Sequence, residues 1–155
     1  VELFAFDRCA SLTTLRMPAV ETVAGWAFRH CVSLQTVDMP AVAIVSHSAF
    51  NNCTSLKTVD MPAVITVSHC AFEECPSLDT MHMPAVLSIC SHAFVGCPSL
   101  VFVDCPPAIA NDVNAFPDRP KAIDAWLAAA AAAMVGCVHP NLQRAILEQA
   151  RPLQR

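Results

Sequence analysis

The chain has 155 residues, is 55% hydrophobic and 14% charged, and carries a formal net charge of −4. A chain of this length suits one domain with a core of its own. Residues 1–116 hold four Lys or Arg against ten Asp or Glu, a balance of −6, which argues against nucleic acid as a partner because nucleic-acid binders carry a basic stripe.

One sequence unit recurs along residues 1–116 at a constant interval of 22 residues. A constant period between about 20 and 50 residues predicts a solenoid, a propeller or an array. This interval is too short for a helical hairpin or a four-stranded blade, so each coil is expected to hold one short strand and one return segment. The residues predicted to form a structural ladder inside the coils are Phe6, Phe28, Phe50, Phe72 and Phe94, with Cys9, Cys31, Cys53, Cys75 and Cys97.

The strand of each coil is expected just before a proline. In the second coil, Leu34–Met39 has the Leu-x-x-Leu-x-Leu form of a leucine-rich repeat strand. Val37 is predicted to face inward, and its neighbours Thr36 and Asp38 outward, because side chains alternate along a strand. Pro40 then ends the strand, since proline has no N–H for the sheet.

The return side of the coil is expected to combine an inward apolar pair with a helical turn. Val42 and Val45 are spaced to face inward. Ser46 or Ser48 is predicted to cap a helical turn that carries Phe50 back toward the next strand.

The repeat ends after residue 116, and the composition of residues 117–155 becomes that of helices. Lys121–Val135 is rich in Ala and Leu, which are strong helix formers, and Asn141–Ala150 predicts a second helix. We interpret this pair as a C-terminal cap, because an open solenoid end would expose core and unpaired strand edges.

The expected division is therefore a solenoid of about five coils at 1–116 and a helical cap at 117–155. The chain starts partway into a repeat, so we expect the solenoid to be truncated at its N-terminus. The longest apolar run, Trp126–Val138, spans 13 residues. A membrane-spanning helix needs about 20, so we expect no membrane insertion.

The signature Ala-Phe-x-x-Cys-x-x-Leu-x-x-Val-x-Met-Pro stands at Ala49–Pro62 and, with Met in place of Val, at Ala71–Pro84. This pattern resembles the BspA-type leucine-rich repeats over about residues 4–116. The resemblance implies a large family of proteins that are often displayed on cell surfaces and bind host proteins, matrix proteins or other cells. It implies no particular ligand.

The predicted fold class is an α/β solenoid. It is a right-handed leucine-rich-repeat coil with parallel strands on its concave face and a C-terminal helical cap. In such a solenoid each coil contacts only its neighbours.

The cysteines admit more than one interpretation. Stacked rungs lie ~4.8 Å apart, which a disulfide tolerates, but identical stacked side chains point in parallel and five cannot all pair. Buried free thiols are the favoured interpretation, with disulfide or metal roles as alternatives. The other cysteines fall off the ladder and form no Cys-x-x-Cys motif; they are Cys70, Cys90, Cys105 and Cys137.

Histidines recur near the return turns. His47 and His69 occupy equivalent positions in adjacent coils, and Cys70 and His92 lie one position further on. These residues are either solvated turn residues or the donors of a zinc or copper site. No carboxylate completes a ligand set, so we predict neither a metal nor a cofactor.

The outward strand positions are the predicted partner-binding residues. Adjacent Asp38 and Asp60 would repel each other, and Arg16 and His82 on either flank could relieve the repulsion. Phe102 is the candidate anchor for a partner, or else a contact of the C-terminal cap. The full set on the concave face is Thr14, Arg16, Thr36, Asp38, Thr58, Asp60, Thr80, His82, Phe102 and Asp104.

Catalysis has little support in the sequence. The chain has three Gly and no Tyr, and it lacks Gly-x-Ser-x-Gly and His-Glu-x-x-His motifs. The coils are near-copies of one another, whereas an active site requires a coil that differs. We therefore predict no catalytic residues and no enzyme activity.

These patterns and the resemblance together predict a non-enzymatic protein-binding module that docks an unidentified protein on its concave strand face. We expect a monomer that forms part of a cell-surface or extracellular adhesin or antigen. The alternative is an intracellular leucine-rich-repeat scaffold or regulatory receptor arm in the cytoplasm, where the thiols would stay reduced.

Overall fold

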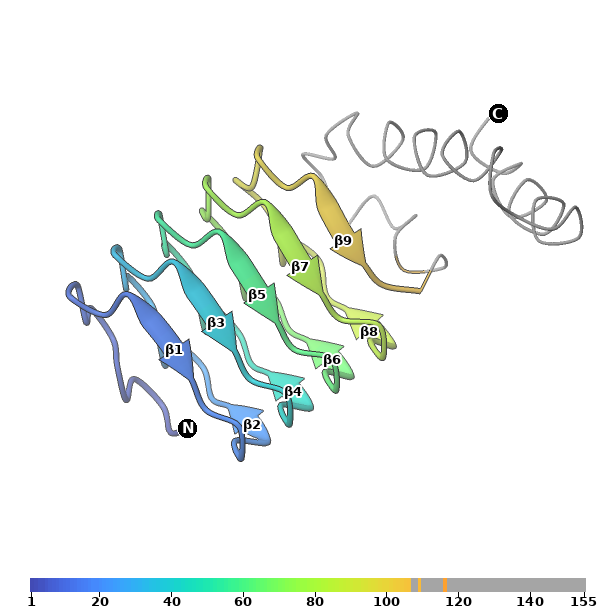
Figure 1. Ribbon diagram of the computed structural model, residues 1–155, viewed down its shortest axis with the longest axis horizontal. Coiled ribbons are helices and arrows are strands. Elements are labelled where there is room, and N and C mark those ends of the chain that lie inside the picture. Colours follow the sequence, from blue (N-terminus) through green and yellow to red (C-terminus); the bar gives the residue numbers. More distant parts are fainter. Residues whose placement is uncertain (107–108, 110–115, 117–155) are drawn as a thin grey trace, which may run out of the picture. The chain divides into compact units, whose positions relative to one another are not determined.

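The computed structural model describes residues 1–106, 109 and 116, which all lie in the first of two compact units of the chain, Val1–Pro120. This part of the chain is a solenoid of short strands joined by turns (Figure 1). Its strands are β1 (Thr14–Arg16), β2 (Thr22–Val23), β3 (Thr36–Asp38), β4 (Ile44–Val45), β5 (Thr58–Asp60), β6 (Thr66–Val67), β7 (Thr80–His82), β8 (Ser88–Ile89) and β9 (Phe102–Asp104).

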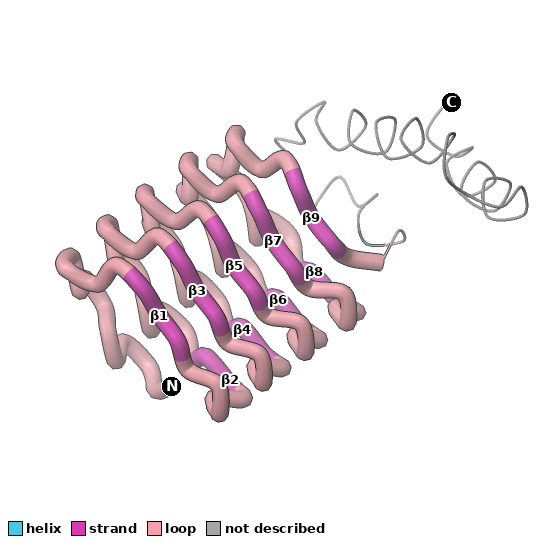
Figure 2. The backbone as a smooth tube through the Cα atoms, in the orientation of Figure 1, coloured by secondary structure: helices cyan, strands magenta, loops and turns pink. Residues whose placement is uncertain are grey.

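The strands form two parallel sheets that run along the solenoid (Figures 1 and 2). One sheet has the order β1-β3-β5-β7-β9 and the other the order β2-β4-β6-β8. Every pairing joins residues 22 positions apart, as where Val37 lies between Leu15 and Val59. The sequence period is therefore the register of the sheets, and both sheets turn their buried residues into one common core.

The second sheet was not predicted from the sequence. Its strands are only two residues long, and in each the second residue is buried and the first exposed or partly exposed. Val42 and Val45 are fully buried, as their spacing predicts. Sequence analysis found the inward residues of the return side but not the ladder hydrogen bonds that make it a sheet.

The prediction of a helical turn after Ser46 or Ser48 is wrong. Residues 1–106 contain strands and turns but no α-helix. Ser48 has a φ of +52°, a left-handed conformation that a helix N-cap does not adopt. Its N–H donates to the carbonyl of His69 in the next coil, at 3.0 Å.

Two left-handed residues per coil explain why the turn replaces a helix. A helix directs its N–H groups along its own chain, whereas here alternate N–H groups of the turn donate to the following coil. The N–H of Phe50 donates to the carbonyl of Ala71 at 2.8 Å, and that of Asn52 to Glu73 at 2.9 Å. The left-handed residues are Phe4, Trp26, Ser48, Cys70 and His92 in one row, and Arg8, His30, Asn52, Glu74 and Gly96 in the other.

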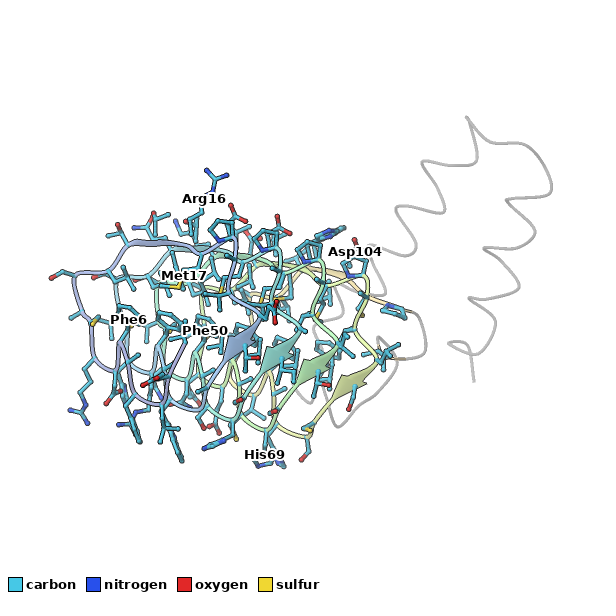
Figure 3. All side chains as sticks on the ribbon, turned by 90° about the horizontal axis from the view of Figure 1, so that it is seen from below. Phe6, Arg16, Met17, Phe50, His69 and Asp104 are labelled. Carbon is cyan, nitrogen blue, oxygen red and sulfur yellow. The ribbon has the colours of Figure 1, made fainter. Side chains whose placement is uncertain are left out.

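A stack of phenylalanine rings runs through the core. The ring centroids of Phe28, Phe50 and Phe72 lie 5.1 Å apart in succession, and the planes of Phe50 and Phe72 differ by 1°. The stack continues to Phe6 at one end and to Phe94 and Phe116 at the other, with centroid separations of 5.0–5.4 Å. Figure 3 shows Phe6 and Phe50 inside the coil, while Arg16 and Asp104 project from the surface.

Some sequence-based predictions lie outside the described residues. They are the helical cap at 117–155, and with it the α-helical share of the predicted α/β class. The division of the chain at residue 116 also stays a prediction, as do the right-handed coil and its concave curvature. The described strands support the predicted parallel-strand solenoid.

Phe50→Ala is expected to lower the free energy of unfolding by about 3–5 kcal/mol, because the ring is fully buried and has a stacked ring on each side. Denaturant titration followed by circular dichroism measures the change. Lys57→Ala, which truncates an exposed side chain in the same coil, is the control and is expected to change stability by less than about 0.5 kcal/mol. A loss below about 1 kcal/mol for Phe50→Ala would contradict the structural role of the stack.

Candidate functional site

The five-stranded sheet presents two rows of outward side chains to solvent. In β1, β3, β5 and β7 the middle residue is buried, and the two flanking residues are exposed or partly exposed. In β9 all three residues are partly exposed. The structure thus brings together the ten residues of the predicted site, and we refer to them as the outer face: Thr14, Arg16, Thr36, Asp38, Thr58, Asp60, Thr80, His82, Phe102 and Asp104.

One ion pair and one histidine–aspartate contact organise the charged row of the outer face. Arg16 Nε lies 3.1 Å from Asp38 Oδ2, and His82 Nδ1 lies 2.7 Å from Asp104 Oδ2. Asp60 stands between these pairs, as the register partner of Asp38 on one side and His82 on the other. Among the described residues Asp60 forms no ion pair. Arg16 therefore pairs with Asp38, as predicted. Relief of the repulsion at Asp60 by its register partner His82 stays a prediction, since the His82 ring contacts Asp104.

The second row of the outer face consists mainly of threonines. Thr14, Thr36, Thr58 and Thr80 are aligned across four strands, and Phe102 continues the row on β9. Neighbouring strands lie ~4.8 Å apart, so the hydroxyl groups recur at a regular spacing. Phe102 is partly exposed. Its predicted alternative, contact with the C-terminal cap, lies outside the described residues.

The opposite side of the solenoid carries exposed aliphatic residues that sequence analysis did not single out. Ile44, Ile65 and Leu87 are 44%, 43% and 72% exposed. Ile65 and Leu87 are stacked, since the N–H of Leu87 donates to the carbonyl of Ile65 at 2.9 Å. Their equivalents in the first two coils are Glu21 and Ala43, so this row changes character along the chain. This change of residue type between equivalent positions indicates a surface row, because the core positions keep similar residue types in each coil.

The cysteine ladder is a ladder of hydrogen bonds. In each of four coils the buried thiol donates to the carbonyl oxygen of a ladder phenylalanine 25 residues earlier, with sulfur–oxygen distances of 3.1–3.2 Å. The donors are Cys31, Cys53, Cys75 and Cys97, and the acceptors are Phe6, Phe28, Phe50 and Phe72. The eight cysteines of the described residues all carry free thiols. The spacing predicts stacking, but the carbonyl that each thiol meets is evident only from the three-dimensional structure.

Burial keeps two of the ladder thiols, Cys31 and Cys75, protonated. Burial raises the pKa of the Cys31 thiol to about 12, and the neighbouring Cys53 adds to the rise. Burial likewise raises the pKa of Cys75, with further contributions from Cys53 and Cys97. A thiol that keeps its proton is a poor nucleophile and a poor metal ligand, so these residues act as structural donors.

The histidines near the return turns, His47, His69 and His92, do not form a metal site within the described residues. The rings of His47 and Trp26 lie nearly perpendicular, at a centroid distance of 4.0 Å. His69 lies near His92 at 5.2 Å, and its Nδ1 is 3.1 Å from the Ser91 hydroxyl. Among the described residues no three His, Cys, Asp or Glu side chains converge on a position that could hold a metal ion.

Cys70, which follows His69 in the sequence, is not an activated nucleophile. Its pKa is raised to about 11, first by burial and then by the neighbouring Glu73 carboxylate. An active-site thiol instead needs a lowered pKa.

One ion pair ties neighbouring turns together. The Arg29 guanidinium donates two hydrogen bonds of 2.9 Å to the Asp7 carboxylate, which lowers the pKa of Asp7. This contact joins the first coil to the second and serves stability.

Within the described residues, no helix is long and apolar enough to cross a membrane.

Comparison with protein families agrees with this geometry. A family model described as a BspA type leucine rich repeat region matches residues 1–118 in six copies. The match covers more than half of the chain and the whole of the stacked region. Comparison with curated proteins found no match.

Solved structures of bacterial proteins share the fold. A leucine-rich repeat protein of T. pallidum is 30% identical with a TM-score of 0.61, and the match covers 65% of this chain and 49% of that one. A leucine-rich repeat protein from Bacteroides ovatus ATCC 8483 is 25% identical with a TM-score of 0.62, over 70% of this chain and 29% of that one.

A third match is a leucine-rich cell surface protein from Faecalibacterium prausnitzii A2-165. It is 27% identical with a TM-score of 0.52, over 56% of this chain and 24% of that one. The chain therefore spans half or less of the length of the three proteins it resembles.

Thiol labelling is expected to separate the cysteines by burial. In the native protein iodoacetamide should modify exposed Cys9 and Cys90 and spare Cys31, Cys53 and Cys75. Peptide mapping by mass spectrometry measures the extent at each site, and labelling in denaturant, where every thiol should react, is the control. Native labelling of Cys53 as fast as Cys90 would contradict the buried ladder.

The raised pKa of Cys31 predicts an alkaline loss of stability. In the folded chain the Cys31 thiol keeps its proton up to about pH 12, whereas in the unfolded chain it loses the proton at about pH 8.5. The stabilisation is thus complete below about pH 8.5 and declines as the pH rises toward 12, by at most about 1.4 kcal/mol per pH unit. Cys31→Ser, which keeps a donor but does not ionise, should flatten the decline in denaturant melts between pH 8 and about 10.5. Cys90→Ser is the control, and equal slopes for wild type and Cys31→Ser would refute the prediction.

Proposed function

The chain belongs to the BspA-type leucine-rich repeat family, and we propose that it is a non-enzymatic protein-binding module whose partner docks on the outer face. The observation that best supports this proposal is the arrangement of the outer face. Five strands hold two rows of outward side chains in register, and the inward residues of β1, β3, β5 and β7 are almost completely buried. Repeat solenoids commonly use such extended surfaces for binding.

The outer face differs from the core in how its residues vary. Inward positions repeat the same residue types in every coil, whereas the charged row holds Arg16, Asp38, Asp60, His82 and Asp104. A surface that only maintained solubility would not need a particular order of charges. A varied order on a rigid support provides specificity, because the partner must match each charge at its own position.

Asp60 is the proposed centre of recognition. Asp38 has an ion-pair partner, Arg16, and Asp104 has a close contact with the His82 ring, while Asp60 is exposed and has no such partner among the described residues. A basic side chain of the partner would supply the missing charge and separate Asp60 from Asp38. Thr58, two residues earlier on the same strand, offers a hydroxyl group for a hydrogen bond. Its register partner Thr80 donates its own hydroxyl to the Asp79 carboxylate and can still accept.

The cell surface is the proposed location. One of the similar solved structures is a leucine-rich cell surface protein, and all three are bacterial leucine-rich proteins. In this proposal the chain is the binding part of a surface adhesin or antigen. The family is generally non-enzymatic, and the protonated thiols and scattered histidines described above support a binding role over a catalytic one.

A second candidate function rests on the cysteines. All eight described cysteines carry free thiols, and four donate hydrogen bonds that a disulfide would remove. Reducing surroundings preserve such thiols. This observation favours an intracellular scaffold or receptor arm that uses the same outer face.

Charge reversal tests the proposed surface. Asp60→Lys is expected to weaken partner binding at least tenfold, because the substitution replaces the unpaired carboxylate with a like charge for the partner's basic group. Cross-linking through a photoreactive residue at Thr58 identifies the bound protein, and titration against that purified protein measures the affinity. The variant should stay folded, since Lys at position 60 would face Asp38 and remove a like-charge contact.

Thr66→Lys is the matched control. Thr66 lies on β6 in the other sheet, so the same new charge is placed on the opposite side of the solenoid. This variant is expected to bind as wild type does. Equal affinity for wild type and Asp60→Lys, with both proteins folded, would overturn the outer face as the docking surface.

A further inference from the structure

The turn between β4 and β5 carries a sequence that no other coil has. Residues 52–54 read Asn-Cys-Thr, which is the Asn-x-Thr acceptor motif for N-linked glycosylation. The third position of this motif is Ala10, Val32, Pro76 and Pro98 in the other coils. Cysteine at the middle position belongs to the core ladder, so the motif arises from the two surface residues on either side of it.

We propose that Asn52 is an acceptor site for an N-linked glycan. The modification goes beyond partner binding and does not involve the outer face, because Asn52 lies in a turn and not on a strand of either sheet. The donor is a lipid-linked oligosaccharyl diphosphate. The Asn52 amide nitrogen Nδ2 forms a bond to sugar carbon C1 and loses one proton. The bond from C1 to the diphosphate oxygen breaks, and the lipid diphosphate leaves with the electron pair.

The hydrogen bonds of Asn52 leave room for this bond. The side-chain amide has two N–H groups. One donates to the Asn51 carbonyl Oδ1 at 2.9 Å, and the described residues offer no partner for the other. Because a glycan replaces only one amide hydrogen, the contact with Asn51 can persist. The backbone N–H of Asn52 is used separately, in a 2.9 Å bond to the Glu73 carbonyl.

The backbone at this position suits asparagine and keeps its side chain at the surface. Asn52 has a φ of +59°, a left-handed conformation that asparagine tolerates better than most residues. Its side chain is partly exposed, whereas the next residue, Cys53, is fully buried and donates to the Phe28 carbonyl at 3.2 Å. The buried thiol holds the turn in place, and a glycan on Asn52 would extend into solvent without entering the core.

The same geometry determines when the transfer would occur. A glycosylating enzyme must reach the backbone around the acceptor asparagine, yet in the folded coil Cys53 is inaccessible and the Asn52 N–H is bonded to the next coil. Transfer therefore precedes folding of this coil, as the chain is translocated. The folded coil then has only to accommodate the finished glycan.

Translation of the full 155-residue chain into endoplasmic-reticulum microsomes, behind an appended signal peptide, tests the proposal. The wild-type product is expected to show a slower-migrating form that peptide N-glycosidase F removes. Mass spectrometry of the treated protein should find aspartate at position 52. Absence of the glycosidase-sensitive form, with the chain protected from external protease inside the microsomes, would overturn the proposal.

Two variant pairs locate the site. Thr54→Ser keeps the acceptor motif and should be glycosylated, whereas Thr54→Ala removes the motif but leaves Asn52 in place and should not be. Asn52→Gly, which tolerates the left-handed backbone, should lose the glycan, whereas Asn51→Gln should keep it. A glycosidase-sensitive form that persists in Asn52→Gly would refute Asn52 as the acceptor.

A stability measurement tests the fit of the glycan to the folded coil. The glycosylated protein and its enzymatically deglycosylated form are expected to unfold cooperatively at the same denaturant concentration. A glycoform without a cooperative transition would show that the turn cannot hold the modification. Because none of these measurements uses a binding partner, their failure leaves the outer-face proposal standing, and failure of partner binding leaves this one standing.

Discussion

Hydrogen bonding between successive coils is the constraint on which the rest of this structure depends. Each coil repeats after 22 residues, so every backbone group and every side chain lies beside its own equivalent ~4.8 Å away. Residues whose copies attract each other can occupy the interior. Phenylalanine rings stack at 5.0–5.4 Å from Phe6 to Phe116, and cysteine thiols bond the carbonyls of these phenylalanines. The core therefore has similar residue types in every coil, because each core residue packs against its own equivalent in the neighbouring coil.

The stacking of equivalent residues also makes a surface row of identical charges unfavourable. Identical carboxylates in register repel, and the outer face contains one such contact, between Asp38 and Asp60. Arg16 and His82 are each placed against an aspartate, but neither pairs with Asp60. Mixed charges at equivalent positions give this face a fixed order. Asp60 is the carboxylate of the face for which the described residues show no side-chain partner, and for this reason we propose it as the centre of recognition.

The left-handed residues of the turns obey a third constraint, because none of their side chains is buried in the core and none lies on a strand. Two left-handed residues per coil let the backbone donate to the next coil whatever the side chain is. Equivalent positions therefore hold Arg8, His30, Asn52, Glu74 and Gly96. A turn under this backbone constraint but with free choice of side chain can acquire an acceptor motif in one coil only. Adding a glycan there would leave the core and the outer face unchanged.

The repeat alone was sufficient to predict the solenoid, the inward ladder and the outward rows, because a period of 22 with alternating Thr-Val-Asp strands leaves few other ways to bury the apolar residues. Partners between coils could not be predicted in this way. That Arg16 meets Asp38, that His82 meets Asp104 and that Cys53 meets the Phe28 carbonyl depend on which atoms the stacking brings within 3.2 Å. The second sheet and the left-handed turns depend on backbone hydrogen bonds, which carry no side-chain signature. Sequence periodicity therefore specified which residues share a face. Three-dimensional stacking specified which of them pair and which, like Asp60, have no ion pair within the described part of the chain.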